Sequence, residues 1–553
     1  MKTVRFDEKL AEKYIKEGYW TQETLYDYWE KSAKERPDKE ALVDSTGTRL
    51  TWAEAKQKID RIALAMAKEL GLKKDDTVLI QLPNCVEQFL VRVACERAGV
   101  IALTEMITFR HAEWKWLASQ TKAAGAVVPK VYRDFDFYQM VKEVQSELPH
   151  LKHIIVAGDD VPEDAVSLNK IMEHPYEKEY SIEELKDRRI DAIREVGFLA
   201  TTTGTTGLPK IIEQTMAARA IRASKPHIEN WQLNADDIIV AIAPTAGAPG
   251  GTPTYFCAPM VGAKSALLYE WTPENALEFM EKERATVIAV VPTHLARMLQ
   301  LPVENYDLSS MRFVRTSGGP LAPALADEAE ERFHCPVLST YGTQDTGSVS
   351  GMPITASKEI RRLTVGKPPA GNETKILDES GKEVKQGEVG LLYFRSPSAP
   401  AGYYRDLEKT MSEAFDPEGW ACPGDLVVQD EEGYLRIVGR QKDIIIRGGQ
   451  NIYPGEIEGF LTTHPKVSAA AVVAMPDKIM GEKACAFVVL RKKGEQFTFD
   501  EMVEYLKSKK IAMYKLPERL EILEALPVVS ESKVDKKLMR QWVTDKLKAE
   551  GKV

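Results

Sequence analysis

Ten residues between Thr201 and Lys210, Thr-Thr-Thr-Gly-Thr-Thr-Gly-Leu-Pro-Lys, are of the types that can hold a polyphosphate. The glycines permit a tight turn that presents N–H groups and hydroxyls, and Lys210 adds an ammonium. The Walker A pattern requires lysine directly after its second glycine, whereas Leu208 and Pro209 intervene here. A plain Ser/Thr/Gly run is more often a flexible surface loop. Because proline fixes the geometry just before the cation, we favour a phosphate loop.

Composition narrows the class of protein. At 553 residues the chain is too long for one core, which predicts about two to four packed units. A net charge of -9 with interspersed signs argues against nonspecific nucleic-acid binding. The N-terminal residues are too charged for a secretory segment, and the apolar runs are far shorter than a membrane span. We therefore expect a soluble, cytoplasmic protein without a nucleic-acid partner and without integral membrane association.

The cysteines are scattered along the chain, and no two form a Cys-x-x-Cys pair. Their spacing suggests no disulfide pairing, so we expect buried free thiols in a reducing compartment. They are Cys85, Cys95, Cys257, Cys335, Cys422 and Cys485.

Strand-like and helix-compatible segments alternate over the first two thirds of the chain and must position these residues. Residues 77–82 are strand-like and residues 86–98 are helix-compatible, and the same order recurs further along. This alternation predicts parallel sheets covered by helices. Further predicted strands are 126–128, 153–156, 237–242, 285–291 and 311–315, and further predicted helices are 25–33, 134–148 and 321–334.

From about residue 370 the sequence changes to short, hairpin-like segments separated by glycines. A boundary is expected near 439–443, and the compact α+β unit beyond it has a size usual for a domain. We predict a large domain over 1–439, with a β-rich part at about 370–439, and a small domain over 440–553. The segments are strands at 372–377, 390–394, 425–428, 434–438, 467–475 and 483–491, and helices at 454–463 and 499–507.

Ordered motifs across nearly the whole chain resemble those of the acyl-adenylate-forming superfamily, which includes AMP-dependent acyl- and aryl-CoA synthetases. The run 201–210 resembles its phosphate loop, and Tyr-Gly-Thr-Gln-Asp at 341–345 resembles Y-G-x-T-E. Trp-Ala-Cys-Pro-Gly-Asp at 420–425 resembles W-x-x-T-G-D. The remaining motifs are Gly-Arg-Gln-Lys-Asp at 439–443, Gly-Gly-Gln-Asn-Ile-Tyr-Pro at 448–454, and the lysine region 526–533.

The resemblance implies an α/β fold with a large N-terminal domain of helix-covered sheets and a distorted β-barrel subdomain. A small, mobile α+β domain would follow, with the hinge at Lys442. It also implies an ATP-dependent carboxylate–CoA ligase that uses Mg²⁺ and passes through an acyl-AMP. The substrates would be a carboxylic acid, ATP and CoA, and the products acyl-CoA, AMP and pyrophosphate.

Activating a carboxylate on ATP brings two anions together, so cations and oriented dipoles are needed where charge develops. The resemblance assigns Lys210 and Lys533 to catalysis and Asp345 to the metal. It assigns Asp425 to the ribose hydroxyls, which suits the two acceptor oxygens of a carboxylate. Tyr341 would stack on adenine. The implied nucleotide-binding set is Thr202, Thr203, Gly204, Thr205, Thr206, Gly207, Lys210, Ser317, Gly318, Gly319, Pro320, Tyr341, Gly342, Thr343, Gln344, Asp425, Arg440 and Lys533.

Two parts of the C-terminal region have ordinary structural alternatives. Gly448 and Gly449 would face the site when the small domain turns, leaving room for the pantetheine of CoA, but a plain β-turn would look the same. Lys533 with its neighbouring lysines would alone indicate a solvated helix face. The preceding Leu526 and Pro527, and the distance from the domain boundary, favour the catalytic role.

Several positions depart from the family pattern. Gln344 stands where the family has Thr or Ala, and Asp345 stands where it has Glu, which shortens the metal carboxylate by one methylene. Pro423 replaces a threonine next to the ribose aspartate, and Ser532 stands where glycine is common. These changes affect the fine geometry and leave Lys210, the two aspartates and Lys533 in place.

The segment 243–252, with Ala246, Gly247 and Ala248, is the expected acid pocket. No acidic residue lies between positions 241 and 268, which argues against an amino-acid substrate. Small, uncharged side chains predict space for an apolar aromatic, alicyclic or medium-chain acid. A Gly/Pro-rich loop without a substrate role is the alternative.

Two other functions stay open at this point. A stand-alone adenylating enzyme could load the thiol of a carrier protein, although no carrier attachment motif follows the small domain. A non-catalytic nucleotide-binding scaffold is the second, and the retained lysines and Asp425 argue against it. The identity of the acid and the oligomeric state, a homodimer included, are not determined by the sequence.

Overall fold

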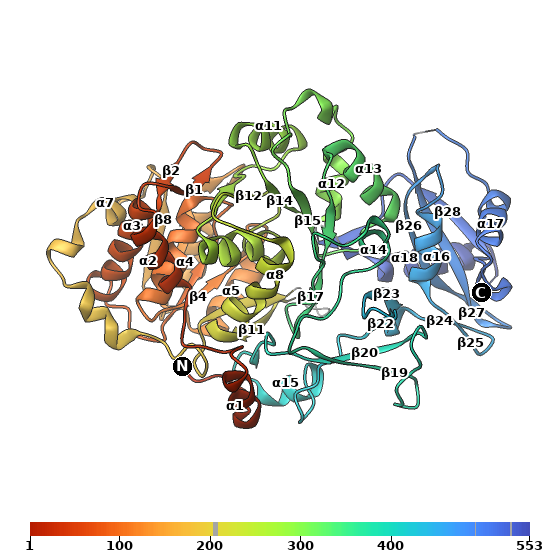
Figure 1. Cartoon of the computed structure of the whole chain (residues 1–553), viewed down its shortest axis with the longest axis horizontal. Coiled ribbons are helices and arrows are strands. Elements are labelled where there is room, and N and C mark those ends of the chain that lie inside the picture. Colours follow the sequence, from red (N-terminus) through yellow and green to blue (C-terminus); the bar gives the residue numbers. More distant parts are fainter. Residues whose placement is uncertain (203–207, 493, 531–532, 553) are drawn as a thin grey trace.

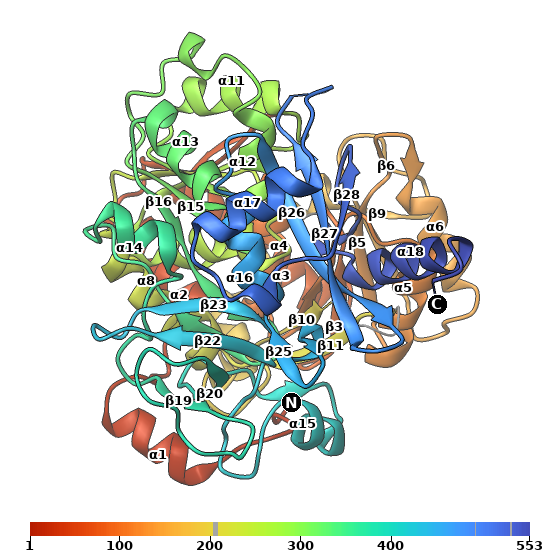
Figure 2. The same ribbon diagram turned by 90° about the vertical axis from the view of Figure 1, so that its right-hand side faces the viewer.

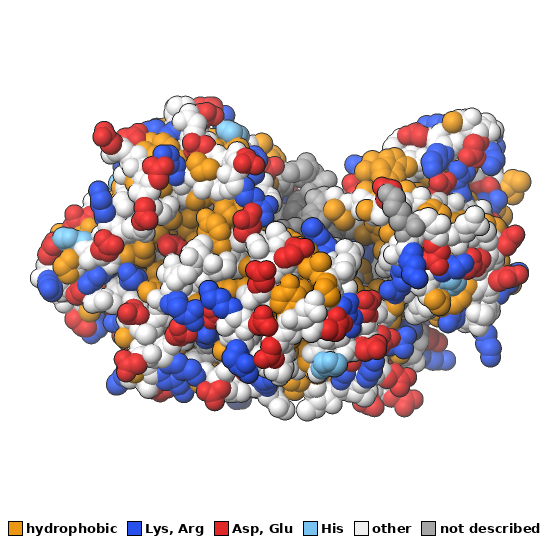
Figure 3. Space-filling view, turned by 90° about the horizontal axis from the view of Figure 1, so that it is seen from above, with side chains coloured by type: hydrophobic (Ala, Val, Ile, Leu, Met, Phe, Trp, Pro, Cys, Tyr) orange, Lys and Arg blue, Asp and Glu red, His pale blue; other side chains and the backbone are white. Residues whose placement is uncertain are grey.

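The computed structural model describes residues 1–202, 208–492, 494–530 and 533–552. They form a large lobe and a smaller C-terminal lobe, which lies at the right of Figure 1. Viewed from above, the surface is notched between the two lobes (Figure 3). No helix of the described part is long and apolar enough to cross a membrane.

One core sheet of the large lobe carries the strands on either side of the phosphate loop. Its strands are parallel from β10 to β9, whereas β11 and β21 add to one edge as antiparallel strands. The central strands are buried on both faces, as parallel sheets require. In spatial order they are β21 (Gly402–Tyr403), β11 (Lys210–Gln214), β10 (Phe198–Thr202), β4 (Ile101–Thr104), β3 (Thr77–Ile80), β5 (Gly125–Pro129), β8 (His153–Ala157) and β9 (Val166–Ser167).

The second core sheet is parallel except at one edge, where β2 runs antiparallel to β1. Its other edge, β16, leads into the motif at 341–345. In spatial order it contains β16 (Val337–Ser339), β15 (Phe313–Thr316), β14 (Val287–Val290), β12 (Ile238–Ala241), β13 (Lys264–Leu267), β1 (Glu40–Asp44) and β2 (Arg49–Thr51).

Helices cover both faces of the two sheets. The core cluster that joins the sheets contains α2 (Leu25–Glu35), α3 (Trp52–Leu64) and α4 (Val86–Arg97). The outer face of the first sheet packs against α5 (His111–Thr121) and α6 (Phe137–Gln145). The outer face of the second packs against α11 (Pro273–Glu283), α12 (Pro292–Met298) and α13 (Pro323–Phe333). The predicted helix-covered parallel sheets are therefore confirmed.

The helix predicted at 134–148 begins later than expected. Phe135 and Asp136 form the short strand β7, which pairs with β6 (Val131–Tyr132). The Asp136 side chain then accepts a hydrogen bond from the backbone N–H of Gln139 at 2.7 Å, which caps α6. A local hairpin and a cap therefore displaced the start of the helix.

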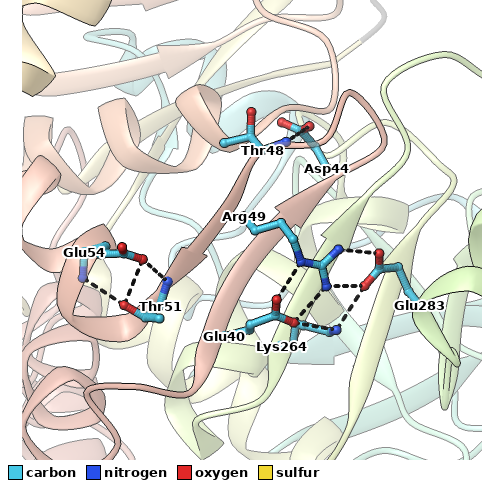
Figure 4. Close-up of polar contacts among 8 residues, drawn as sticks. All are labelled: Glu40, Asp44, Thr48, Arg49, Thr51, Glu54, Lys264 and Glu283. Carbon is cyan, nitrogen blue, oxygen red and sulfur yellow. Dashed lines mark hydrogen bonds and ion pairs between the residues drawn. The ribbon is translucent and has the colours of Figure 1, made fainter.

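An ionic cluster fixes the edge of the second sheet farthest from β16 (Figure 4). Arg49 donates hydrogen bonds to both Glu40 and Glu283, and Lys264 lies 3.0 Å from a carboxylate oxygen of each. The cluster therefore joins β1, β2, β13 and the end of α11. The same close-up shows Thr51 and Glu54 forming the capping box that begins α3.

The β-rich segment forms a four-stranded antiparallel sheet below the two core sheets in Figure 1. Its strands are β19 (Glu373–Leu377), β20 (Gly390–Arg395), β22 (Asp425–Gln429) and β23 (Leu435–Arg440). The β22–β23 hairpin matters most for the site, because its register pairs Asp425 with Arg440.

The C-terminal lobe is built on a five-stranded sheet, seen in front in Figure 2. One face packs against α16 (Pro454–Leu461) and α17 (Phe499–Ser508), and the other against α18 (Lys536–Ala549). The close approach of α16 to β23 depends on Gly455, since a Cβ there would lie 2.5 Å from the Val438 carbonyl oxygen. The strands are β24 (Ile445–Arg447), β25 (Gln450–Ile452), β26 (Val467–Asp477), β27 (Gly481–Leu490) and β28 (Arg519–Leu523).

Candidate functional site

The segment predicted to hold phosphates lies between two antiparallel strands, with Thr202 at the end of β10 paired with Lys210 at the start of β11. The indole N–H of Trp116 donates to the carbonyl oxygen of Pro209 at 3.1 Å, which holds the chain just before the lysine. The predicted residues Thr203, Gly204, Thr205, Thr206 and Gly207 lie outside the described residues.

Lys210 is the centre of a charged cluster formed from three segments. Its ammonium donates to Glu413 of α15 (Leu407–Glu413) at 2.7 Å and to the Tyr403 hydroxyl at 3.2 Å, and it lies 4.0 Å from Asp345. The Tyr403 hydroxyl donates to Asp345 at 3.0 Å. Burial works to lower the pKa of Lys210, but the bonds to Glu413 and Tyr403 outweigh it and raise the pKa. Lys210 is therefore a cation next to the predicted metal carboxylate.

A second cluster surrounds the buried carboxylate of Asp425. The Tyr341 hydroxyl donates to one oxygen, and the Arg440 Nε–H donates to the other at 2.9 Å. Burial and the neighbouring carboxylate raise the pKa of Tyr341 well above its ordinary value. Each carboxylate oxygen keeps a second lone pair, so the group can still accept from a ligand's hydroxyls.

The hairpin of β17 (Tyr341–Thr343) and β18 (Gly347–Ser350) joins the two clusters. It presents Tyr341 to Asp425 and, four residues later, Asp345 to Tyr403. Gly342 is required where the strands approach, since a Cβ would lie 2.7 Å from the Gly347 carbonyl oxygen. The motif predicted at 341–345 is therefore a single structural unit.

The predicted adenine slot follows β15. Ser317 is buried there, while Gly318 and Pro320 are exposed and Gly319 is half-buried. Gly318 has a φ of +86°, which suits glycine, so the chain turns sharply after the strand.

The predicted acid-pocket residues Ala246, Gly247 and Ala248 line an open cavity, whose empty space of about 380 Å³ includes the solvent at its mouth. The walls also include Phe198 and Leu199 of β10, Phe256, and two cations that the sequence did not indicate, Arg92 and Arg219. The segment expected to be lined by small uncharged groups is therefore only one wall of a pocket that also contains positive charge.

Polar anchors hold the loop that carries these residues. The Asn84 amide oxygen accepts from the backbone N–H of Thr245 at 2.9 Å, and its amide nitrogen donates to the Ala243 carbonyl at 3.1 Å. The hydroxyl of Thr245 also donates to Gln88 at 2.5 Å. Gly251 allows the following helical turn to pack on this loop, because a Cβ would meet the Thr245 carbonyl oxygen at 2.6 Å. The N-terminus of α4 thus positions the pocket.

Arg219 connects the acid pocket to the nucleotide motif. It lies on the helical turn Met216–Arg222, directly after β11, and donates to the side-chain oxygen of Gln344 at 2.9 Å. Gln344 is the residue that departs from the family pattern, and it also lines the pocket. The unusual glutamine therefore has a partner in this chain.

The predicted hinge and C-terminal residues lie in the connection to the small lobe and within it. Lys442 is exposed in the turn Gln441–Asp443 between β23 and β24, and the next residue accepts from Arg540 at 2.5 Å. Gly448 and Gly449 have φ values of +55° and +82° in the β24–β25 turn, and a Cβ on Gly448 would meet Met480. The backbone of Lys533 begins β30 (Lys533–Val534), and 531–532 lie outside the described residues.

The side chains of the site fit a metal ion that is bound mainly by substrate phosphates and water, with one carboxylate from the protein. No cluster of three His, Cys, Asp or Glu side chains able to hold a metal exists in the described part of the chain. Mg²⁺ typically takes one or two carboxylates together with substrate phosphates and water. Asp345, beside Lys210, could supply that one carboxylate.

The chain matches known protein families over most of its length. Residues 29–404 match the model of the AMP-binding enzyme family, and residues 456–533 match the AMP-binding enzyme C-terminal domain. The chain belongs to the AMP-binding enzyme family. The predicted membership of the adenylate-forming superfamily is therefore confirmed.

Similar proteins include acid ligases of two kinds. A 2-hydroxy-7-methoxy-5-methyl-1-naphthoate–CoA ligase of Streptomyces carzinostaticus is 32% identical, over 97% of this chain and 96% of the relative. A 2,3-dihydroxybenzoate-AMP ligase of Bacillus subtilis is 31% identical over 98% of each chain. The structure of an anthranilate CoA ligase with anthranoyl-AMP has the same fold, with a TM-score of 0.82, 24% identity, and coverage of 96% of this chain and 98% of its own.

Four side chains of the site were not found from the sequence: Tyr403, Glu413, Arg92 and Arg219. Tyr403 and Glu413 reach Lys210 from a segment about two hundred positions away, and no motif marks them. Arg219 carried a weak signal, since it lies nine positions after Lys210 in the strand–helix unit that follows the phosphate loop.

Proposed function

We propose that this AMP-forming acid–thiol ligase uses CoA as its thiol and Mg²⁺-ATP as its activating substrate. It would convert a carboxylic acid into acyl-AMP and then into acyl-CoA, with release of pyrophosphate and AMP. The observation that carries the proposal is the 341–345 hairpin. It contributes Asp345 beside Lys210 and contacts Asp425 through Tyr341, and its Gln344 lines the cavity proposed to hold the acid.

These side chains have distinct tasks in the proposed first half-reaction. Lys210 offsets charge on the phosphates, and Asp345 provides the carboxylate for the metal, which neutralises further phosphate charge when bound. Asp425 accepts from the ribose, while Arg440 holds that carboxylate in place. Lys533 would bridge the attacking carboxylate and the α-phosphate when the small domain closes. Lys442 serves as the hinge, and Gly448 and Gly449 leave room for CoA.

The acid is proposed to be aromatic, alicyclic or of medium chain length. Ala246, Gly247 and Ala248 leave space on one wall, and Phe198 and Phe256 supply flat apolar surface on another. The naphthoate–CoA ligase and the dihydroxybenzoate-AMP ligase act on aromatic acids by name, which supports an aromatic ring in this pocket.

A carrier-protein thiol is the second candidate acceptor, because one of the relatives is an aryl-AMP ligase and not a CoA ligase. The decisive experiment measures AMP release from ATP in the presence of an acid that the enzyme adenylates. One arm contains free CoA and the other a pantetheinylated carrier protein. We expect thioester and AMP in the CoA arm. AMP release that requires the carrier arm would refute the CoA assignment while leaving adenylation intact.

A first screen identifies the acid. Exchange of labelled pyrophosphate into ATP is measured across aromatic, alicyclic and fatty acids of increasing size. Acid-dependent exchange is expected, and Lys210→Ala serves as the matched control that should lose it. Failure of every acid in the wild-type protein would contradict the proposed adenylation activity itself.

A further inference from the structure

Arg219 places a positive charge in a pocket whose other walls suit an apolar carboxylic acid. It lines the cavity together with Phe198, Phe256 and the small residues of the 246–248 wall. Its guanidinium donates to the neutral side-chain oxygen of Gln344. Burial lowers its pKa to about 10, so the group remains protonated at neutral pH. The pocket therefore contains a permanent positive charge.

No carboxylate among the described residues forms an ion pair with Arg219. The sequence 203–207, which lies outside the described residues, contains no acidic residue. Arg219 is half-buried, and a charge that is partly withdrawn from water is unfavourable unless it is paired. A ligand could therefore supply the negative or hydrogen-bond-accepting group that Arg219 lacks among the described residues.

Two other arginines near the pocket are already used by the fold. The Arg92 guanidinium lies 3.5 Å from the centre of the Tyr255 ring and donates to the Thr245 carbonyl oxygen. Arg315 donates to the Pro249 carbonyl at 2.7 Å and to the Thr340 hydroxyl. Both hold backbone or ring groups of the pocket wall. In contrast, among the described residues Arg219 donates a hydrogen bond to one side-chain amide, that of Gln344.

The reacting carboxylate does not need Arg219 as its main cation. In the proposed mechanism, Lys533 and Lys210 serve the attacking carboxylate and the phosphates. An arginine presents several N–H donors in a planar fork, which matches an oxygen group of a bound molecule. A site built to hydrogen-bond such a group discriminates strongly against analogues that lack it.

We propose that the acid substrate carries a second oxygen substituent, a carboxylate or hydroxyl on its ring, which accepts hydrogen bonds from Arg219. This inference rests on the proposed function and refines it, from an apolar acid to an oxygen-substituted aromatic or alicyclic acid. Gln344 holds the guanidinium in position until the substituent arrives. Arg219 is thus a specificity-determining residue.

The test compares benzoate with its 2-, 3- and 4-hydroxy and 2-, 3- and 4-carboxy derivatives, and the same set on a cyclohexane ring. The kcat/KM of pyrophosphate exchange is measured for wild type, Arg219→Met and Arg219→Lys. Arg222→Met is the matched control, because Arg222 lies on the same helical turn but binds the Ala370 carbonyl and the Tyr19 ring outside this pocket.

In wild type, at least one oxygen-substituted acid should exceed its unsubstituted parent by roughly 10- to 100-fold, the range for a hydrogen bond to a charged group. Arg219→Met should erase this ratio, Arg219→Lys should keep part of it, and Arg222→Met should leave it unchanged. The ratio is read within one protein, so a loss of stability in a variant does not mimic the effect.

Two results would overturn the inference. One is a wild-type enzyme that uses the unsubstituted parents as well as every substituted acid. The other is an Arg219→Met variant that loses activity equally on both, which would assign Arg219 to the reacting carboxylate. Both leave the proposed ligase activity standing, whereas absence of exchange with every acid in wild type would reject that activity together with the inference.

Discussion

Charges on the two sides of the site have different partners. On the nucleotide side, Lys210 lies 2.7 Å from Glu413, and Arg440 lies 2.9 Å from Asp425. On the acid side, Arg219 donates to the neutral amide of Gln344. The cations of the first side thus have carboxylate partners within the protein, whereas Arg219 has none among the described residues.

This difference indicates how each ligand would be recognised. A nucleotide phosphate must compete with Glu413 for Lys210, so binding exchanges one ionic partner for another and the net gain is moderate. A group that reaches Arg219 competes only with a neutral amide there, so the gain per contact is larger. Selectivity would therefore be concentrated on the acid side, while the nucleotide side provides alignment and catalysis.

The largest expected effect concerns Lys533. Lys533→Ala should reduce adenylation about a hundredfold or more, because its charge offsets repulsion that exists only when the carboxylate attacks. Conversion of synthetic acyl-adenylate and CoA into acyl-CoA should stay close to normal if, as proposed, the small domain turns Lys533 away for that step. Measuring the two half-reactions separately decides this. Equal loss in both would contradict a lysine that serves one domain arrangement.

The next effect concerns Asp345. Asp345→Ala should sharply reduce acid-dependent pyrophosphate release at limiting Mg²⁺, whereas Asp345→Glu keeps the charge and should be milder. A titration of initial rate against Mg²⁺ measures both variants beside wild type, with circular dichroism as the control for folding. Wild-type activity of Asp345→Ala at low Mg²⁺ would remove Asp345 from the metal site.

Asp425→Asn tests the second pair on the nucleotide side. An amide has one acceptor oxygen in place of two, so it cannot keep Tyr341 and Arg440 and also accept from a ribose. We expect the KM for ATP to rise roughly tenfold or more, the effect of losing a hydrogen bond to a charged group. The KM for the acid should hardly change. A rise confined to the acid KM would mean that the carboxylate faces the other substrate.

On the acid side, Gly247→Leu should act as a size filter. A Cβ at Gly247 would meet Pro249 and Pro244 only at ordinary contact distances of 3.5 and 3.6 Å, so the loop itself can accept a side chain. The leucine should penalise bulky acids by about 1–3 kcal/mol through overpacking and spare small ones. A uniform decrease across an acid size series would show damage to the loop instead.

The smallest effect is expected for Glu413→Gln, which removes the resident partner of Lys210. Because this pair is partly exposed, we expect a two- to fivefold decrease in the KM for ATP, in line with the roughly 0.2–1 kcal/mol of surface ion pairs. Glu408→Gln, at an exposed carboxylate on the same helix, is the control. An increased KM would mean that Glu413 positions Lys210 and does not compete for it.

The sequence predicted the strands and helices well because their buried faces are regular. The strands at 77–82 and 390–394 agree with the structure to within two residues, since mostly apolar runs bounded by turn-forming residues mark them: Asp76 and Pro83 for the first, Gly387 for the second. The helix expected at 134–148 started late because a two-residue hairpin used its first positions. The pairing of two such short strands leaves no mark on the hydrophobic periodicity of the sequence.

For the site, sequence reasoning reached the residues that lie inside motifs and missed those that arrive from elsewhere. Asp425 and Arg440 were named from two separate motifs, and the hairpin register places them side by side. Tyr403 and Glu413 meet Lys210 only because β21 pairs with β11. Arg219 was overlooked because an isolated arginine in a helical segment is ordinarily a solvated surface residue.

The ionic cluster of Figure 4 has a consequence for acid tolerance. Hydrogen bonds from Arg49, opposed by partial burial and aided by Lys264, hold the pKa of Glu40 at about 2, below its ordinary value of 4.5. A carboxylate with a depressed pKa stabilises the fold above about pH 4.5 and loses this contribution as the pH falls towards 2. Acidification should therefore loosen the β1–β2 edge, which lies at the opposite end of its sheet from β16, the strand that leads into the β17–β18 hairpin.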